Sequence, residues 1–138
     1  MVSCSRITAR VTNARMTVLE KMKKVYDYER RHFSIGGSHT FHSSAHHDVI
    51  YARSMLKKKR GACYGWGALY AYLANSCGAK KCAFISSGGH GWAEVAGKVS
   101  DPDWEFADHS KSYFNFSYDE SGHGRPNYKA CRSSVRWI

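Results

Sequence analysis

The chain of 138 residues has no long hydrophobic run, only two prolines and few acidic residues. No apolar stretch approaches the roughly 20 residues that a membrane-spanning helix needs. Residues 1–14 also lack the apolar centre of a secretory signal. The sequence therefore predicts no transmembrane segment. A chain of this length buries roughly 65–70% of its unfolded surface in one core, so we expect a single domain over residues 1–138.

Acidic residues are scarce: 11 Asp and Glu face 21 Lys and Arg, which gives a net charge of +10. This excess favours an anionic partner such as a cell-envelope polymer, a membrane surface, nucleic acid or an acidic substrate. The basic residues are dispersed over residues 21–31, 57–60 and 80–81, which is typical of solvated helix faces. No helix-turn-helix, zinc-finger or ribonucleoprotein motif is present. Nucleic acid is therefore the least favoured of these partners.

The cysteine count is odd, because Cys4, Cys63, Cys77, Cys82 and Cys131 make five. In an oxidising compartment four could form disulfides, for example Cys4 with Cys131 and Cys77 with Cys82, although the sequence alone does not fix the pairing. Cys63 would then remain free. In a reducing compartment all five would be thiols. The cysteine content and the Tyr-, Ser-, Gly- and Asn-rich composition favour a secreted or cell-envelope domain cut from a longer precursor, with a cytoplasmic protein as the alternative.

Apolar residues at three- and four-residue intervals predict three helices in the N-terminal part, about residues 14–77. The first covers residues 15–33, with Asn13 as its N-cap, and a loop over 34–44 follows it. The second covers 46–59 and ends at Gly61. The third begins at Cys63 and ends at Cys77-Gly78, where glycine permits the left-handed conformation.

After Gly78 the pattern changes to alternation, which predicts a sheet part over about residues 80–138. We expect antiparallel strands over 81–86, 90–99 and 104–110, with a turn at 101–103. The side chains of His90, Trp92 and Glu94 would share one face of the middle strand. The tail from residue 113 predicts one or two more strands and carries no recognisable chemistry. The fold class is therefore α+β, with the third helix packed on a small antiparallel sheet.

Three residues at the ends of these elements suggest catalysis. Cys63 lies on the first turn of a predicted helix, where backbone N–H groups and the helix dipole favour a thiolate. Antiparallel pairing would bring the start of the strand at His90 beside the end of the strand at Asp108. Each residue alone has an ordinary structural explanation: an apolar cysteine, a turn histidine and a capping aspartate. Together, a thiol, a base and an orienting carboxylate are what nucleophilic acyl transfer needs.

The segments Gly61-Ala62-Cys63, His90-Gly91-Trp92-Ala93-Glu94-Val95 and Phe106-Ala107-Asp108 resemble a transglutaminase-like domain of the papain-like superfamily. The resemblance covers about residues 45–112. It implies Cys63 as nucleophile, His90 as general base and then acid, and Asp108 as the residue that orients the imidazole, with no cofactor. The chain departs from the family in its short length and in His109-Ser110 after Asp108, where many relatives have Pro or Ala and Thr. On this alignment Asp101 and Asp103 are not expected to replace Asp108.

The resemblance implies a cysteine peptidase or amidase that acts on a peptide, a protein or a cell-envelope substrate. A transglutaminase that cross-links proteins and a non-catalytic binding module on the same scaffold are the alternatives. A zinc module is a further alternative, with ligands from the following histidines: His32, His39, His42, His46 and His47. Their spacing matches no strong zinc signature and the chain has no Cys-x-x-Cys pair, so no metal ligand is predicted.

Overall fold

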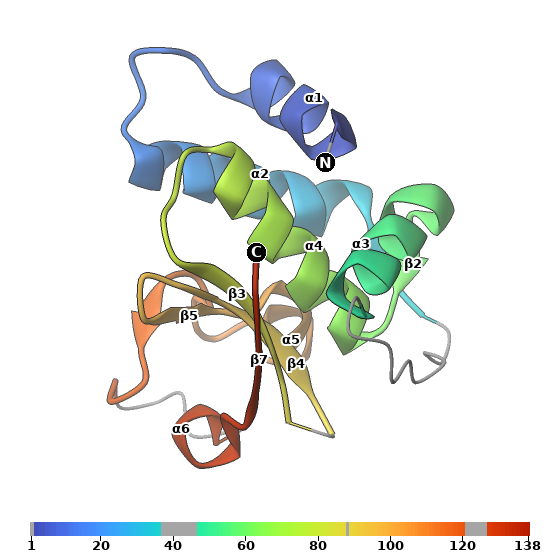
Figure 1. Ribbon diagram of the computed structural model, residues 1–138, viewed down its shortest axis with the longest axis vertical. Coiled ribbons are helices and arrows are strands. Elements are labelled where there is room, and N and C mark those ends of the chain that lie inside the picture. The colour runs from blue at the N-terminus through green and yellow to red at the C-terminus, as the bar shows by residue number, and fades with distance from the viewer. Residues whose placement is uncertain (1, 37–46, 88, 121–126) are drawn as a thin grey trace.

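The computed structural model describes residues 2–36, 47–87, 89–120 and 127–138. Four helices form one layer: α1 (Val2–Val11), α2 (Val18–His32), α3 (His47–Lys58) and α4 (Cys63–Ser76). As Figure 1 shows, α4 lies between the other helices and a sheet built from the C-terminal half of the chain. This arrangement confirms the α+β class. No described helix has both the length and the apolar character needed to cross a bilayer.

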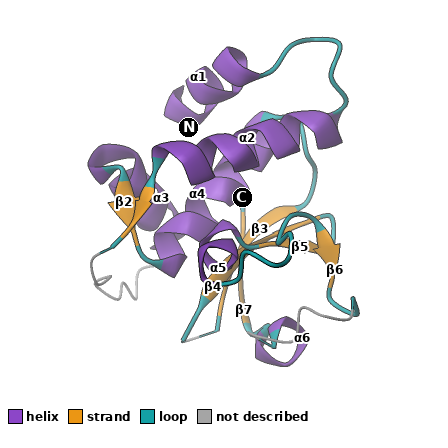
Figure 2. Ribbon diagram, turned by 180° about the vertical axis from the view of Figure 1, so that it is seen from behind, coloured by secondary structure: helices purple, strands orange, loops and turns teal. Residues whose placement is uncertain are grey.

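The sheet contains five antiparallel strands in the order β6-β5-β4-β3-β7. They are β3 (Cys82–Ser86), β4 (Gly91–Val95), β5 (Lys98–Ser100), β6 (Phe116–Ser117) and β7 (Ser134–Trp137). The two-residue strands β1 (Ser34–Ile35) and β2 (Arg60–Gly61) pair in parallel. The short helices α5 (Pro102–Ala107) and α6 (Tyr128–Cys131) complete the fold (Figure 2). The last strand pairs with β3, so the C-terminal tail forms one edge of the sheet.

The two faces of the sheet bury different sets of residues. Phe84, Ala93 and Val95 pack in the helical core around α4. Their neighbours in the chain point to the opposite face, as the period of a strand requires. That second cluster consists of Ala83, Ile85, Trp92, Val99, Tyr113, Phe116 and Tyr128. The tail thus supplies much of the second cluster.

Several helix ends agree with the predicted boundaries, and one does not. Helix α4 begins at Cys63 as expected, and Gly78 after it has a φ of +92°. Helix α2 begins later than predicted, because Thr17 and not Asn13 is its N-cap. The Thr17 hydroxyl accepts from the Glu20 N–H, and the Glu20 carboxylate accepts from the Thr17 N–H. This capping box fixes the start of the helix. Helix α1 was not predicted.

The predicted strands after residue 90 require two corrections. The expected strand over 90–99 is a hairpin of β4 and β5, because Ala96 and Gly97 form a two-residue turn with φ values of +48° and +80°. Positive φ at both turn residues matches the right-handed twist of paired strands. The expected strand over 104–110 is replaced by helix α5. Asp101 caps this helix by accepting from the Trp104 N–H, and Pro102 occupies its first turn.

The predicted disulfides do not form, since all five cysteines are free thiols. Cys4 is buried on α1 and Cys131 is exposed on α6. These two helices lie at opposite ends of the molecule (Figure 1), which separates the expected partners. Cys77 and Cys82 are both buried, and the Cys82 thiol donates to the Ala79 carbonyl at 3.5 Å. Burial raises the pKa of the Cys82 thiol to about 11.

Candidate active site

Cys63 is the first residue of α4, and only the N-cap Ala62 separates it from strand β2. The indole N–H of Trp66 donates to the Gly61 carbonyl at 3.0 Å, which ties the turn to the helix that it precedes. The thiol is half-buried and packs against the helical core. The local sequence thus places a partly accessible sulfur at a helix N-terminus, as predicted.

The distance between α4 and the sheet depends on a glycine. A Cβ atom at Gly67 would lie 2.8 Å from the Trp92 Cα and 2.9 Å from its carbonyl carbon and nitrogen. The atoms of Trp92 that it would meet are all backbone atoms, so no side-chain rotation could relieve the clash. The absence of a side chain at Gly67 therefore lets α4 pack directly on β4 and brings Cys63 close to the start of that strand.

His90 occupies the turn that precedes β4. The Ser87 N–H donates to the His90 carbonyl at 2.9 Å, and the His90 N–H donates to the Ser87 hydroxyl at 3.2 Å. Its side chain is 11% exposed. The imidazole stacks on Trp92 at a centroid distance of 6.1 Å and meets the edge of Trp104 at 5.6 Å. Aromatic rings on two sides therefore restrict its rotation.

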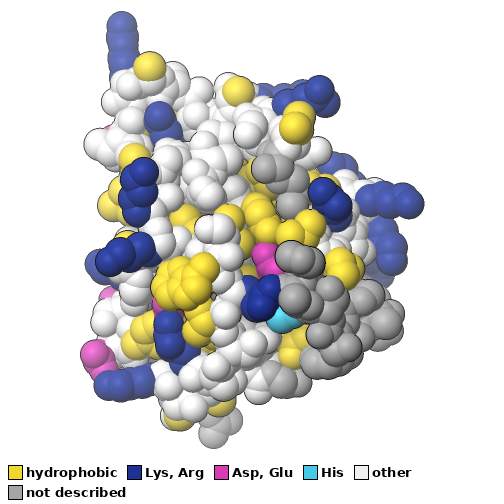
Figure 3. Space-filling view, in the orientation of Figure 1, with side chains coloured by type: hydrophobic (Ala, Val, Ile, Leu, Met, Phe, Trp, Pro, Cys, Tyr) yellow, Lys and Arg dark blue, Asp and Glu magenta, His cyan; other side chains and the backbone are white. Residues whose placement is uncertain are grey.

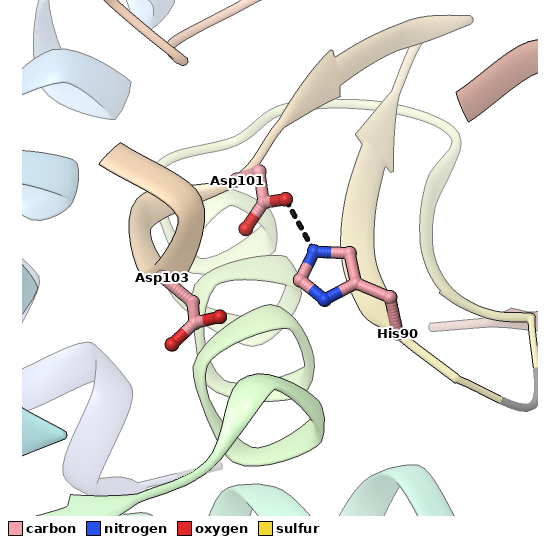
Figure 4. A group of neighbouring side chains, drawn as sticks. All are labelled: His90, Asp101 and Asp103. Carbon is pink, nitrogen blue, oxygen red and sulfur yellow. Dashed lines mark hydrogen bonds and ion pairs between the residues drawn. The ribbon is translucent and has the colours of Figure 1, made fainter. Parts of the chain in front are cut away.

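The carboxylate that contacts His90 belongs to Asp101 and not to Asp108. His90 Nε2 lies 2.6 Å from Asp101 Oδ2, as Figure 4 shows. The other oxygen of Asp101 is occupied as the α5 cap, and the residue is 1% exposed. Antiparallel pairing does bring an aspartate to His90, but through a different strand: β5 ends at Ser100, and its hairpin with β4 sets Asp101 beside His90.

Asp108 lies at the opposite end of α5 and has other partners. One of its oxygens accepts from the Ser110 N–H at 3.1 Å, and the other accepts from the Tyr113 hydroxyl at 2.8 Å. These hydrogen bonds, with that of the Ser110 hydroxyl first, lower the pKa of Asp108. The predicted contact between Asp108 and His90 is therefore absent, because residues 102–107 form a helix where a strand was expected.

The tail contributes a residue that the sequence did not reveal. The Tyr128 hydroxyl donates to Asp101 Oδ2 at 2.7 Å and is buried with it. Its ring also meets Trp92 edge to face at 5.1 Å. No motif marks Tyr128, which lies 27 residues beyond Asp101. The side chain thus adds a second hydrogen bond to the Asp101 oxygen that contacts His90.

The imidazole is hydrogen bonded to the Cys63 side chain as well as to Asp101. Burial lowers the pKa of His90, but hydrogen bonds to Asp101 and Cys63, together with their negative charges, outweigh burial and raise the pKa to about 10. His90 therefore holds a proton in the folded protein at neutral pH. The structure brings the thiol, the imidazole and a carboxylate into one hydrogen-bonded chain.

A second carboxylate lies beside this chain. Donor atoms of His90, Asp101 and Asp103 all lie within 4.8 Å of one another. Asp103 is half-buried and points from α5 toward the imidazole (Figure 4). Burial and the charge of Asp101 raise the pKa of Asp103 to about 6, while the charge of His90 acts in the opposite direction. The three donors could contact a metal ion, but His90 Nε2 and Asp101 Oδ2 already bind each other.

Of the five histidines of the zinc alternative, His39, His42 and His46 lie outside the described residues. His47 packs against Tyr51 and Phe84, and His32 stacks on Tyr28 at 4.2 Å. Both are engaged with aromatic rings. Within the described ranges, His90, Asp101 and Asp103 form the one group of three donors close enough to share an ion.

Comparison with known proteins gives one match. The profile of a family described as the transglutaminase-like superfamily matches residues 5–109. This range contains Cys63, His90, Asp101, Asp103 and Asp108. No curated protein and no solved structure matches the chain.

Proposed function

The chain belongs to the transglutaminase-like superfamily, and from this premise we propose that it catalyses thiol-dependent acyl transfer on peptide or carboxamide bonds. Cys63 is the nucleophile, His90 is the general base and then acid, and Asp101 orients the imidazole. The observation that supports these roles is the hydrogen-bonded chain from Cys63 through His90 to Asp101. Asp101 takes the role that the sequence suggested for Asp108.

The hydrogen bond between His90 and Asp101 decides which ring nitrogen of His90 exchanges a proton with Cys63. Asp101 holds Nε2 of His90, so Nδ1 exchanges the proton with the Cys63 sulfur. The thiolate attacks the carbonyl carbon, and the imidazolium gives its proton to the departing amine. The first-turn N–H groups of α4 are directed toward the charge that develops on the carbonyl oxygen. A thioester on Cys63 is the intermediate.

Water resolves this thioester in the simplest case, which makes the protein a cysteine peptidase or amidase. An amine in place of water would give transglutamination, and the two reactions share every earlier step. The substrate is a peptide or protein. The excess of Lys and Arg, scattered over the surface in Figure 3, suits a cell-envelope setting with an anionic polymer as partner.

The test is to incubate the protein with glutamine-donor peptides and a peptide library, and to detect the acyl-enzyme and the products by mass spectrometry. Cys63→Ala should lose product formation by about 10³-fold or more, because no other group replaces the sulfur. Cys131→Ala is the matched control, since it removes an exposed thiol elsewhere and should leave the rate unchanged. Equal activity of Cys63→Ala and wild type would refute the function.

Selective alkylation provides a test that needs no substrate. Iodoacetamide at pH 6 should modify Cys63 faster than Cys131, although Cys131 is the more exposed. The reason is that His90 takes the proton of the Cys63 thiol, whereas Cys131 lies on α6, outside this site. Peptide mapping identifies the modified residue. Faster labelling of Cys131 would show that His90 does not activate Cys63.

A further inference from the structure

We propose that a hollow between helices α1, α2 and α3 binds the phosphate group of an organic phosphate ester. The hollow has a volume of about 210 Å³. It lies beside α1, which packs on the side of the helical layer that faces away from the sheet (Figures 1 and 2). The inference does not rest on the acyl-transfer function proposed above. It concerns cationic side chains that the proposed reaction does not use.

Three cations converge on this hollow from two segments of the chain. Arg6 and Arg10 lie four residues apart, and therefore on one face of α1, and Lys59 directly follows α3. All three side chains are exposed, and no described residue forms a hydrogen bond or ion pair with their charged groups. The Lys59 ammonium lies 5.2 Å from the centre of the Phe33 ring. Like charges at this helical spacing repel each other, so a bound anion would relieve the repulsion.

The carboxylates of the protein do not balance these charges. All 11 acidic residues lie in the described ranges, and none of them lines the hollow. Asp27 and Glu29 are the acidic residues next in sequence to the lining residue Tyr28. Asp27 pairs with Lys23 at 2.9 Å, and Glu29 is fully buried. Burial raises the pKa of Glu29 well above its ordinary value, which favours the neutral carboxyl group. The positive charge at the hollow is therefore available to a ligand.

The remaining lining indicates which kind of anion fits. Ile7, Leu56 and Tyr28 are buried or half-buried and form an apolar base beside the exposed cations. The ring of Tyr28 stacks on His32 at a centroid distance of 4.2 Å, which restricts its rotation. Guanidinium groups bind phosphate oxygens through paired hydrogen bonds, and a phosphate monoester carries a charge of about −1.5 to −2 at pH 7. An apolar base next to such a site favours an organic phosphate over the inorganic ion.

Calorimetric titration of the whole protein with phenyl phosphate at low ionic strength tests the cations. Arg6→Gln/Arg10→Gln should weaken binding at least about tenfold, because two charge-assisted hydrogen bonds are lost. Arg15→Gln/Lys80→Gln is the matched control, since it removes the same net charge from exposed positions outside the hollow. This control should change the affinity by no more than about twofold, because solvent and salt screen distant charges. Equal affinities of the two double variants would overturn the site.

Other ligands test the chemistry of the bound group. Inorganic phosphate should bind at least about fivefold more weakly than phenyl phosphate, because it leaves the apolar base in contact with water. Benzyl alcohol, which has the ring without the phosphate, should not bind. Equal affinities of inorganic phosphate and phenyl phosphate would overturn the organic ester as ligand. Phosphatidylglycerol vesicles provide the last comparison. Vesicle binding that requires Arg6 and Arg10, with no binding of phenyl phosphate, would assign these cations to a membrane surface and overturn the proposal.

Thermal unfolding distinguishes a ligand site from a structural role of the two arginines. Without ligand, Arg6→Gln/Arg10→Gln should have a Tm equal to or above that of wild type, since glutamine is a good helix former and the repulsion is gone. Phenyl phosphate at about 100 times its Kd should raise the Tm of wild type and not that of the variant. A variant that is less stable without ligand and gains as much from phenyl phosphate as wild type would show that the arginines only hold α1 in place.

Discussion

The two ends of helix α5 carry the two aspartates that follow His90 in the chain, and their surroundings differ sharply. Asp101, at the N-terminal end, is 1% exposed and accepts hydrogen bonds from Tyr128 and the Trp104 N–H while it holds His90. Asp108, at the C-terminal end, is partly exposed and is held by Ser110 and Tyr113. Both carboxylates are well satisfied. The difference is that one of them reaches an imidazole.

This difference shows that the presence of hydrogen-bond partners does not by itself identify a functional carboxylate. Asp108 with its hydrogen bonds stabilises the end of a helix and the loop beyond it. Asp101 makes the same kind of capping bond with one oxygen and directs the other oxygen to His90. The aspartate that caps α5 is therefore also the aspartate that contacts His90. Its position is fixed by the strand before it and the helix after it.

The largest expected effect separates the two aspartates directly. Asp101→Asn should reduce kcat/KM by about 10³ to 10⁴, because an amide can no longer fix the imidazole tautomer or stabilise its protonated form. Asparagine caps helices as well as aspartate does, so α5 should remain folded. Steady-state rates with a glutamine-donor peptide provide the measurement.

Asp108→Asn is the matched control, and its rate should stay within about twofold of wild type, as for most surface substitutions. The reverse outcome, with Asp108→Asn inactive and Asp101→Asn active, would restore the assignment that the sequence suggested. Circular dichroism should show that both variants keep their helical content.

Much of this fold follows from sequence patterns. Helices α3 and α4, the start of α4 at Cys63 and strand β3 lie within one residue of their predicted bounds, because each combines a clear period with a clear end signal. The hairpin of β4 and β5 was hidden, since Ala96-Gly97 interrupts the alternation without a strong turn signature. The strand expected over 104–110 is replaced by helix α5, whereas the one or two strands expected in the tail are present as β6 and β7.

The site was predictable where it depends on local signals and not where it depends on topology. Cys63 follows a turn at a helix start and His90 precedes a strand, and both are visible in the sequence. Asp101-Pro102 is equally typical of a turn and of a helix N-terminus, so only the three-dimensional pairing decides between them. Tyr128 reaches the site because β7 returns to pair with β3, which no local pattern indicates.

The next effect concerns the protonation of His90. In Cys63→Ala, where no thiolate contributes, Asp101 should still hold the pKa of His90 above its ordinary value of 6.5. Adding Asp101→Asn should lower the pKa of His90, because it removes the strongest interaction that opposes burial and leaves the Asp103 carboxylate beside the ring, whereas adding Asp108→Asn should change nothing. A shift of one unit corresponds to about 1.4 kcal/mol. NMR titration of the imidazole Cε1–H signal measures the pKa of His90 in all three proteins.

The interaction between His90 and Asp101 should also make the free energy of unfolding depend on pH in a definite direction. A raised pKa in the folded state means that the folded protein keeps a proton that the unfolded chain releases above pH 6.5. The stabilisation by the pair of His90 and Asp101 is therefore complete below pH 6.5 and disappears as the pH rises through the folded-state pKa. Urea unfolding of Cys63→Ala with and without Asp101→Asn should show a difference that shrinks from pH 6 to pH 10. Equal stability with and without Asp101→Asn at every pH would mean that Asp101 acts only as a helix cap, because asparagine caps equally well.

The smallest effect involves the two tyrosines that hold the two aspartates. Tyr128→Phe removes the hydroxyl that donates to Asp101, so kcat should fall about tenfold through the loss of one hydrogen bond to a charged group. Tyr113→Phe removes the equivalent donor to Asp108 and should leave kcat within about twofold, as for other changes outside the site. The pKa of His90 in Tyr128→Phe should rise further, because Asp101 would then direct its full charge to the imidazole. Loss of stability in both variants with no difference in kcat would mean that Tyr128 only packs the second face of the sheet.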